Sequence, residues 1–287
     1  MLKDKRCVVI GGAGFIGSHI VDKLVDEGAN VLVLDNMSCC DQRNLNLKAE
    51  VWNLDIRNFQ SLRTALIGAD IVFLTAAIAR TPWCIDDPRL AYEVNVLGTL
   101  NVLEACRENG IKRVILSSSN VVYAFDTPYR TSKEALERLC DVYNKMYDQS
   151  VIALRYSNVY GKRQLENDPC PNVFAALRRS KKQKGYLEIT GDGTQSRDYT
   201  HVSDIVRGNV LAALSDYKGI VDLCTGINTP LNDVAKYFEC PIKYIDERSG
   251  DVKHIYQNPK LAMEILGWEA KVKLCDGIND VLEKGTL

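Results

Sequence analysis

The sequence predicts an α/β fold, with a doubly wound parallel sheet followed by a smaller C-terminal lobe of mixed helices and strands. Short β-branched runs alternate with longer helical patterns over the first half of the chain, and this alternation loosens after Tyr160. Continuously apolar strands separated by helices are typical of a parallel sheet that is covered on both faces. We therefore expect a first domain over residues 1–160 and a second lobe over 161–287, with 198–225 returning to the first domain.

Each expected strand of the first domain is a short apolar run. These runs cover residues 7–10, 30–34, 51–53, 71–74, 113–117 and 151–155. The helical patterns between them cover residues 16–27, 61–66, 91–109 and 132–147. In the second half we expect a polar segment over 161–171, a turn over 191–194, and helices over 173–184, 202–214, 231–238 and 259–266.

Composition argues against several classes of function. The 287 residues are 46% hydrophobic, which suffices for a substantial core, and the 36 basic and 37 acidic side chains leave a net charge of −1. Without a large basic field to hold a phosphate backbone, we expect no nucleic-acid partner. The longest nearly apolar run, residues 71–79, is too short to cross a bilayer, and no signal peptide is recognisable, so we expect a cytoplasmic protein without membrane attachment.

The ten cysteines are scattered along the chain, and no C-x-x-C pair occurs among them. Several lie in apolar segments: Cys7, Cys106, Cys140 and Cys224. This distribution is typical of reduced structural thiols in a reducing compartment. Only three histidines are present and they are far apart in the sequence, so we expect no metal site.

A glycine-rich turn follows the first strand and opens the first helix. Gly11, Gly14 and Gly17 have the spacing G-x-x-G-x-x-G. A turn of this kind lets backbone amides approach a pyrophosphate at a helix N-terminus, as in dinucleotide-binding folds of the Rossmann type. Asp35 closes the second strand, where a carboxylate accepts hydrogen bonds from a ribose diol and repels a 2′-phosphate. The pattern therefore predicts NAD, in preference to NADP, as the cofactor.

A candidate catalytic group lies further along the chain. Tyr129 and Lys133 are four residues apart, so their side chains share one face of a helix. A tyrosine hydroxyl has a pKa of about 10, and a nearby ammonium together with the positive ring of oxidised NAD favours the phenolate. Lowering this pKa by ~3 units takes roughly 4 kcal/mol and makes the tyrosine a usable base near neutral pH. Ser119 follows a strand and is expected to hydrogen-bond the same substrate hydroxyl.

In these motifs the sequence resembles the extended short-chain dehydrogenase/reductase family, and within it the nucleotide-sugar epimerases and dehydratases. The likeness covers nearly the whole chain. It includes the serines before Val122 and the pair Tyr129 and Lys133. It also includes the segments 11–17, 35–36, 55–58, 95–99, 155–161, 191–199 and 248–251.

The resemblance implies a role for individual residues. The cofactor-binding residues are then Gly11, Gly14, Phe15, Ile16, Gly17, Asp35, Asn36, Asp55, Ile56, Ala76, Asn95, Tyr129 and Lys133, with Asp55 and Ile56 at the adenine and Asn95 near the catalytic centre. The substrate-binding residues are Ser119, Asn158, Asn172, Val173, Arg197, Arg248 and Asp251. Of these, Asn158, Asn172 and Arg197 are expected to hold a diphosphate, Arg248 a phosphate, and Asp251 the nucleotide ribose. Arginine suits such groups because its planar fork makes paired, charge-assisted hydrogen bonds.

The resemblance also narrows the reaction. Dehydratases of the family need an acid and a base beside the serine, and here those positions are Asn120 and Val121, which cannot transfer a proton. The simplest chemistry left is reversible oxidation: Tyr129 takes the proton of a sugar hydroxyl, NAD takes the hydride, and the keto sugar turns over before hydride returns to its other face. This implies 4-epimerisation of a nucleotide-diphosphate sugar, with a UDP-sugar favoured.

The sequence departs from the family in three places. The stretch between Tyr123 and Tyr129 is short, Ala124 stands where glycine is common, and Thr75 stands where histidine is frequent. The short stretch affects the shape of the sugar pocket. Arg80 lies within reach of an acidic sugar, although a surface role is favoured for it.

Two other functions remain open on the sequence, besides a bare Rossmann-type scaffold without chemistry. One is a net oxidoreductase on the same substrates, either a nucleotide-sugar dehydrogenase or a keto-sugar reductase that uses NAD(P). The other is a non-catalytic protein that senses NAD, although such a protein has no need for Tyr129 and Lys133. The resemblance also implies a homodimer that pairs through the helices over 91–109 and 132–147.

Overall fold

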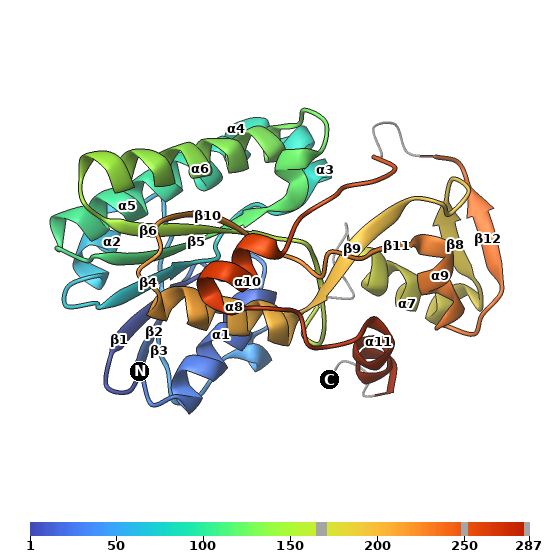
Figure 1. Ribbon diagram of the computed structural model, residues 1–287, viewed down its shortest axis with the longest axis horizontal. Coiled ribbons are helices and arrows are strands. Elements are labelled where there is room, and N and C mark those ends of the chain that lie inside the picture. The colour runs from blue at the N-terminus through green and yellow to red at the C-terminus, as the bar shows by residue number, and fades with distance from the viewer. Residues whose placement is uncertain (165–170, 248–251, 284–287) are drawn as a thin grey trace.

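The largest element of the protein is a seven-stranded sheet (Figure 1). The computed structural model describes residues 1–164, 171–247 and 252–283. The strand order is β10-β6-β5-β4-β1-β2-β3, and every pairing in it is parallel. The strands are β1 (Arg6–Ile10), β2 (Asn30–Asp35), β3 (Glu50–Asn53), β4 (Ile71–Leu74), β5 (Arg113–Ser119), β6 (Ser150–Tyr156) and β10 (Gly219–Leu223). The direction of winding reverses between β1 and β4, and ligands of doubly wound sheets bind at that point.

Helices cover both faces of this sheet, as the sequence predicts for an α/β doubly wound fold (Figure 1). One face carries α1 (Phe15–Asp26), α8 (Val202–Leu214) and α10 (Lys260–Leu266). The other carries α2 (Phe59–Ala65), α5 (Thr99–Glu108) and α6 (Pro128–Met146). The predicted fold class is confirmed.

Alternate side chains of each central strand enter two separate cores. In β1, Cys7 and Val9 belong to the core under α1 and α8, whereas Val8 and Ile10 belong to the core under α2, α5 and α6. Both faces are buried, so the strand is apolar at every position.

The cysteines that the structure describes are free thiols, and no disulfide joins them. Burial raises the pKa of the Cys7 thiol to about 12.

The second lobe is built from two small sheets and three helices, and it lies to the right in Figure 1. Its strand orders are β11-β9-β7 and β12-β8. The elements are β7 (Asn158–Tyr160), α7 (Val173–Lys184), β8 (Leu187–Thr190), β9 (Ser196–His201), β11 (Asn228–Pro230), α9 (Leu231–Lys236), β12 (Ile242–Ile245) and α11 (Leu274–Glu283). After β9 the chain returns to the large sheet, where α8 packs on α1 and β10 pairs with β6. The later helix α10 packs on α8 and β10 as well.

Two expected helices differ from the structure. The pattern over 91–109 is divided into α4 (Pro88–Tyr92), a π-helical turn over Glu93–Gly98, and α5. The helix expected over 132–147 begins earlier, at Pro128, because the Thr127 side chain accepts a hydrogen bond from the Arg130 amide and proline suits the first helical position. Among the described residues, four helical elements were not expected: α3 (Thr81–Asp86), α11 (Leu274–Glu283), and the 3₁₀ turns over Gln42–Asn44 and Asn120–Tyr123.

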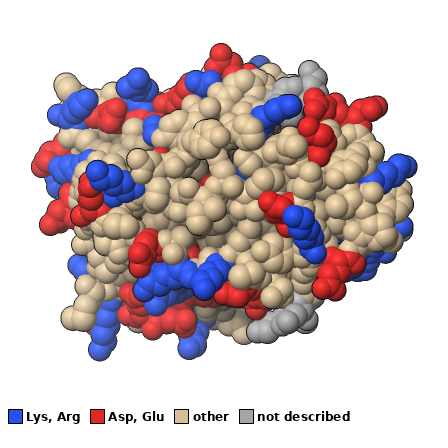
Figure 2. All heavy atoms as spheres, turned by 45° about the vertical axis from the view of Figure 1, so that its right-hand side comes forward, with Lys and Arg blue, Asp and Glu red and all other residues tan. Residues whose placement is uncertain are grey.

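Acidic and basic side chains are interspersed over the face shown in Figure 2, and much of its centre is uncharged. This agrees with the net charge of −1. Of the helices that the structure describes, none has both the length and the apolar character needed to span a bilayer.

Candidate active site

The glycine turn between β1 and α1 has a conformation that only small residues permit. Gly11 has a φ of +82°, and a Cβ built on it lies 2.4 Å from the Ala76 amide nitrogen. A Cβ on Gly17 lies 2.1 Å from the carbonyl oxygen of Gly11. The backbone segments therefore approach each other so closely that a methyl group at either position overlaps main-chain atoms.

The start of α1 fits the pyrophosphate of NAD. Gly14 is the N-cap residue and provides no side-chain hydrogen bond, and no acidic residue lies in the first turn. The first backbone N–H groups of the helix therefore lack a side-chain cap, and the positive end of its dipole meets no carboxylate in that turn. Phe15 and Ile16, both expected at the cofactor, are the first two residues of this helix.

The carboxylates expected at the adenosine lie at the ends of β2 and β3. Asp35 accepts hydrogen bonds from the amides of Ala13 and Met37, at 3.0 and 2.9 Å, so its carboxylate is held beside the glycine turn. Asn36 donates to Asp55 at 3.0 Å. Asp55 also accepts two side-chain hydrogen bonds from Arg57, which hold the pKa of Asp55 well below its usual range. Asp55 is therefore ionised at neutral pH.

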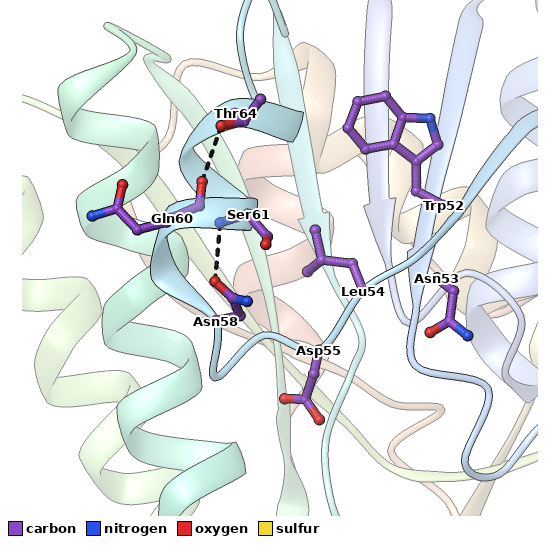
Figure 3. Close-up of a pocket in the computed structure, with 8 residues that line it drawn as sticks. All are labelled: Trp52, Asn53, Leu54, Asp55, Asn58, Gln60, Ser61 and Thr64. Atoms are coloured by element: carbon purple, nitrogen blue, oxygen red, sulfur yellow. Dashed lines mark hydrogen bonds between the residues drawn. The ribbon is translucent and has the colours of Figure 1, made fainter.

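An open pocket of about 500 Å³ lies beyond Asp55, between β3 and α2 (Figure 3). Its lining includes the half-exposed ring of Trp52 and the polar side chains of Asn58 and Gln60. Asp55 is the sole expected site residue that lines it, and neither Tyr129 nor Lys133 does. The pocket therefore adjoins the expected adenine end and is separate from the candidate catalytic group.

Asn95 holds the loop after β4 against α6, the helix that bears Tyr129 and Lys133. Its side chain accepts a hydrogen bond from the Ile78 amide at 2.8 Å and donates to the Ile78 carbonyl and to Ser132 Oγ, both at 3.0 Å. Ile56, expected at the adenine, is buried against Gly98, whose Cβ would lie 2.5 Å from the Ile56 side chain. The π-helical turn thus places Asn95 at the site and packs the loop that follows β3.

Ser119, Tyr129 and Lys133 come together between the end of β5 and the first turns of α6. The Ser119 side chain acts on the Tyr129 hydroxyl as a hydrogen-bond partner, in the direction that favours the phenolate. The Lys133 ammonium lies 5.9 Å from the centre of the Tyr129 ring and donates to the Ser117 carbonyl at 2.8 Å. Lys133 is 4% exposed, so its charge acts in surroundings that water screens poorly.

The pKa values of these groups describe the protein before a cofactor binds. Burial raises the pKa of Tyr129 to about 12, although the hydrogen bond with Ser119 and the charge of Arg80 act to lower it. Burial lowers the pKa of Lys133 to about 8, while Cys84 and Glu137 act to raise it. The protein without a cofactor therefore does not lower the tyrosine pKa, because desolvation of the phenolate outweighs the nearby positive charge.

Four of the residues expected at the substrate lie on the second lobe. Asn158 is on β7, and its side-chain nitrogen is buried with no hydrogen-bond partner among the described residues. Asn172 caps α7 through its side-chain oxygen, and Val173 is the first residue of that helix. Arg197 on β9 donates to the carbonyl oxygens of Ser196 and Lys253 at 2.8 and 3.1 Å. Arg248 and Asp251 lie outside the described residues.

Two residues have site contacts that sequence reasoning missed. The Thr75 hydroxyl donates to the carbonyl oxygens of Ile10 and Gly11, both at 3.0 Å, and so fastens the glycine turn. Arg80, interpreted as a surface residue, exerts its charge on Tyr129. The position of Thr75 directly after a strand next to the turn was the available signal for its role.

The comparisons with known proteins agree with this geometry. Residues 7–222 match the NAD dependent epimerase/dehydratase family. The chain is 30% identical to a UDP-glucose 4-epimerase of Mycolicibacterium smegmatis, with 97% of each chain covered.

Solved structures are similar over their whole length. A UDP-glucose 4-epimerase of Thermotoga maritima, solved with UDP-glucose, is 31% identical with a TM-score of 0.92, and 97% of each chain is covered. A UDP-N-acetylglucosamine 4-epimerase of Methanobrevibacter ruminantium, solved with UDP-N-acetylmuramic acid, is also 31% identical with a TM-score of 0.92, over 99% of this chain and 100% of that one. On this evidence the chain is an enzyme of the NAD-dependent epimerase/dehydratase family of nucleotide-sugar enzymes.

Proposed function

We propose that this enzyme uses NAD to invert the configuration at C4 of a UDP-sugar through a transient keto sugar. The observation that carries the proposal is the meeting of Ser119, Tyr129 and Lys133 at the same carboxyl edge of the sheet as the glycine turn, without a second proton-transferring pair next to Ser119. Asn120 and Val121 occupy the two positions after it. This set of side chains can remove and return one hydroxyl proton, and it offers no further acid and base for eliminating water.

Each residue has a distinct part in the proposed reaction. Tyr129 takes the proton of the C4 hydroxyl and later returns it, and Ser119 hydrogen-bonds the same oxygen. The Lys133 ammonium favours the phenolate form of Tyr129. NAD, when bound, supplies the hydride chemistry and adds a positive charge beside the tyrosine. The residues of the glycine turn bind its pyrophosphate, and Asp35 binds the adenosine ribose.

The UDP-sugar is proposed to bind between the catalytic helix and the second lobe. Asn158 supports this placement, because a buried amide nitrogen without a partner is costly unless a ligand accepts its hydrogen bond. Arg197 and Asn172 are proposed to hold the diphosphate, together with Arg248, while Asp251 binds the ribose. The names of the relatives, which include UDP-glucose and UDP-N-acetylglucosamine 4-epimerases, support a uridine nucleotide and a hexose.

The test is incubation of the purified enzyme with UDP-, dTDP-, GDP- and CDP-sugars, followed by NMR of the products. We expect inverted C4 stereochemistry for a UDP-sugar, with no net change in NADH absorbance. Tyr129→Phe should lower turnover about 10²- to 10⁴-fold, since the acid–base step is lost. Tyr147→Phe, the same loss of a hydroxyl at the C-terminal end of α6 and away from Ser119, is the matched control.

Other outcomes identify the alternatives. Stoichiometric NADH formation or consumption identifies a net dehydrogenase or reductase, which releases its cofactor in each turnover. An epimerase retains its cofactor, so NAD in the protein as purified supports the proposal. NAD binding without turnover on any sugar, and with no effect of Tyr129→Phe, identifies a protein that senses NAD.

A further inference from the structure

A buried carboxylate that the proposed reaction does not use lies one helical turn beyond Lys133. Glu137 on α6 is 6% exposed. Its Oε1 accepts hydrogen bonds from Ser118 Oγ at 2.6 Å and from Arg155 Nε at 2.7 Å, and its Oε2 accepts one from Arg155 Nη2 at 2.7 Å. Three charge-assisted hydrogen bonds thus fix both carboxylate oxygens.

The partners of Glu137 lie on two adjacent strands at the level of the site. Ser118 on β5 is directly opposite Arg155 on β6 in the sheet register. Ser118 also immediately precedes Ser119. One side chain of α6 is therefore fastened to both strands next to the serine of the proposed site, while Tyr129 and Lys133 lie earlier on the same helix.

Arg155 also fastens the segment that follows Ser119. Its Nη1 donates to the Tyr123 hydroxyl at 2.5 Å, and its guanidinium lies 4.9 Å from the centre of the Tyr123 ring. The Tyr123 hydroxyl in turn donates to the Asp222 carboxylate on β10 at 3.0 and 3.1 Å. Ser119 is therefore held from both sides, through Ser118 before it and through Tyr123 after it.

A paired buried charge is a poor source of stability, because the cost of removing it from water offsets the attraction. A buried pair does hold its elements in one arrangement, and misplacement of reacting groups by about 1 Å costs up to about 10²-fold in rate. The negative charge of Glu137 also acts to raise the pKa of Lys133 against the effect of burial. The position and the charge of Glu137 therefore both act on the site.

We propose that Glu137, held by Arg155 and Ser118, is a positioning residue of the active site. It sets the distance between the end of β5, with Ser119, and the turns of α6 that bear Tyr129 and Lys133, and its negative charge helps Lys133 to remain an ammonium. The effect of Glu137 on turnover rests on the proposed function. The effect of its charge on the pKa of Lys133 does not depend on which reaction the enzyme performs.

The experiment compares the wild type with Glu137→Gln and Ser118→Ala, using the full chain saturated with NAD. The matched control is Glu104→Gln, since Glu104 on α5 likewise binds an arginine, Arg107, and a hydroxyl, that of Tyr143, away from the site. The measurements are kcat, KM and the titration of Lys133. Carbon-13 NMR of protein labelled at lysine Cε follows that titration, and its loss in Lys133→Met assigns the signal.

We expect Glu137→Gln to lower kcat about tenfold or more, to change KM by less than about twofold, and to move the Lys133 titration to lower pH. Ser118→Ala should lower kcat by a smaller factor and leave the Lys133 titration in place, because the charge of Glu137 remains. Glu104→Gln should match the wild type in kcat, KM and the Lys133 titration.

Wild-type kcat together with an unmoved Lys133 titration in Glu137→Gln would overturn the proposal, and so would an equal loss of kcat in Glu104→Gln. If Glu137→Gln does not fold, a wild-type kcat in Ser118→Ala overturns the positioning role. If the wild type turns over no sugar, the proposed function fails, and the Lys133 titration in Glu137→Gln still decides whether the charge of Glu137 acts as stated.

Discussion

Tyr129 is not available as a base in the protein alone, because burial raises its pKa to about 12 and the hydroxyl keeps its proton at neutral pH. Oxidised NAD brings a positive ring to the site, whereas the ring of NADH is neutral. A unit charge about 6 Å away at an effective dielectric constant of about 20 is worth roughly 3 kcal/mol, or about 2 pKa units. We therefore expect NAD⁺ to lower the pKa of Tyr129 by about 2 units and NADH to leave it nearly unchanged.

Tyrosinate absorbance during a pH titration measures this effect, and the difference from Tyr129→Phe assigns it to one residue. Because the base is the deprotonated form, turnover should rise with pH from neutrality, and the rise should weaken above about pH 8, where Lys133 begins to lose the charge that favours the phenolate. Equal titrations with NAD⁺ and NADH contradict the proposed role of the cofactor charge.

Gly17 gives a second test at the scale of one residue. A Cβ at this position lies 2.1 Å from the Gly11 carbonyl oxygen, so Gly17→Ala pushes the turn apart and should abolish NAD binding. Calorimetric titration with NAD checks this. Gly110→Ala is the matched control: its φ is +69° and nothing lies within 4 Å of the added Cβ, so it should cost about 1 kcal/mol of stability and leave NAD binding intact. Normal binding by Gly17→Ala contradicts the proposed use of this turn.

Among the structural elements, the π-helical turn over Glu93–Gly98 has the clearest consequence, because it aims the Asn95 amide at the Ile78 backbone and at Ser132. Asn95→Ala leaves the buried donor and acceptor of Ile78 without their partner. We expect a loss of about 2–4 kcal/mol in the free energy of unfolding, together with lower turnover. Denaturant unfolding measures the first quantity.

The control for this prediction is Asn101→Ala, which removes two longer hydrogen bonds, at 3.1 and 3.3 Å, from a neighbouring turn. It should cost less than about 1 kcal/mol, because these bonds lie closer to solvent. Equal losses in the two variants contradict a special role for the π-helical turn.

The elements also show what the sequence could and could not predict. The helices over 173–184 and 202–214 were predicted at their observed bounds, and Gly185 ends the first of them in the left-handed region. The division of the helix over 91–109 was not predicted, because a π turn uses the same apolar residues as an α turn and shifts only their register.

The hydrogen bond between Glu137 and Arg155 was also not predicted, since no local pattern shows which residues of α6 and β6 meet. By contrast, the meeting of Ser119, Tyr129 and Lys133 follows from strand and helix positions that the sequence does encode.

At the scale of the whole molecule, α4, α5 and α6 form the outer layer on one side of the large sheet (Figure 1), and large apolar side chains on α6 and in the π-helical turn are exposed. Val142 and Met146 lie one turn apart on α6 with 45% and 72% of their surface exposed, and Leu97 of the π-helical turn is 53% exposed. Large exposed apolar side chains that gather on neighbouring helices mark protein interfaces more often than scattered ones do. We propose that this layer pairs with its copy in a homodimer, as the resemblance to the family implied.

Val142→Glu tests this arrangement, because a dimer would bury the new charge on the interface. We expect size-exclusion chromatography with light scattering to give a dimer for the wild type and a monomer for Val142→Glu. Met263→Glu, a similar change at a residue of α10 that is 55% exposed on the opposite side of the sheet, should remain a dimer. Burying an unpaired charge costs several kcal/mol, and this cost subtracts from the free energy of dimerisation. Even partial burial of the carboxylate in Val142→Glu should therefore shift the equilibrium toward the monomer. A wild type that is monomeric, or a Val142→Glu variant that still dimerises, excludes this layer as the dimer interface.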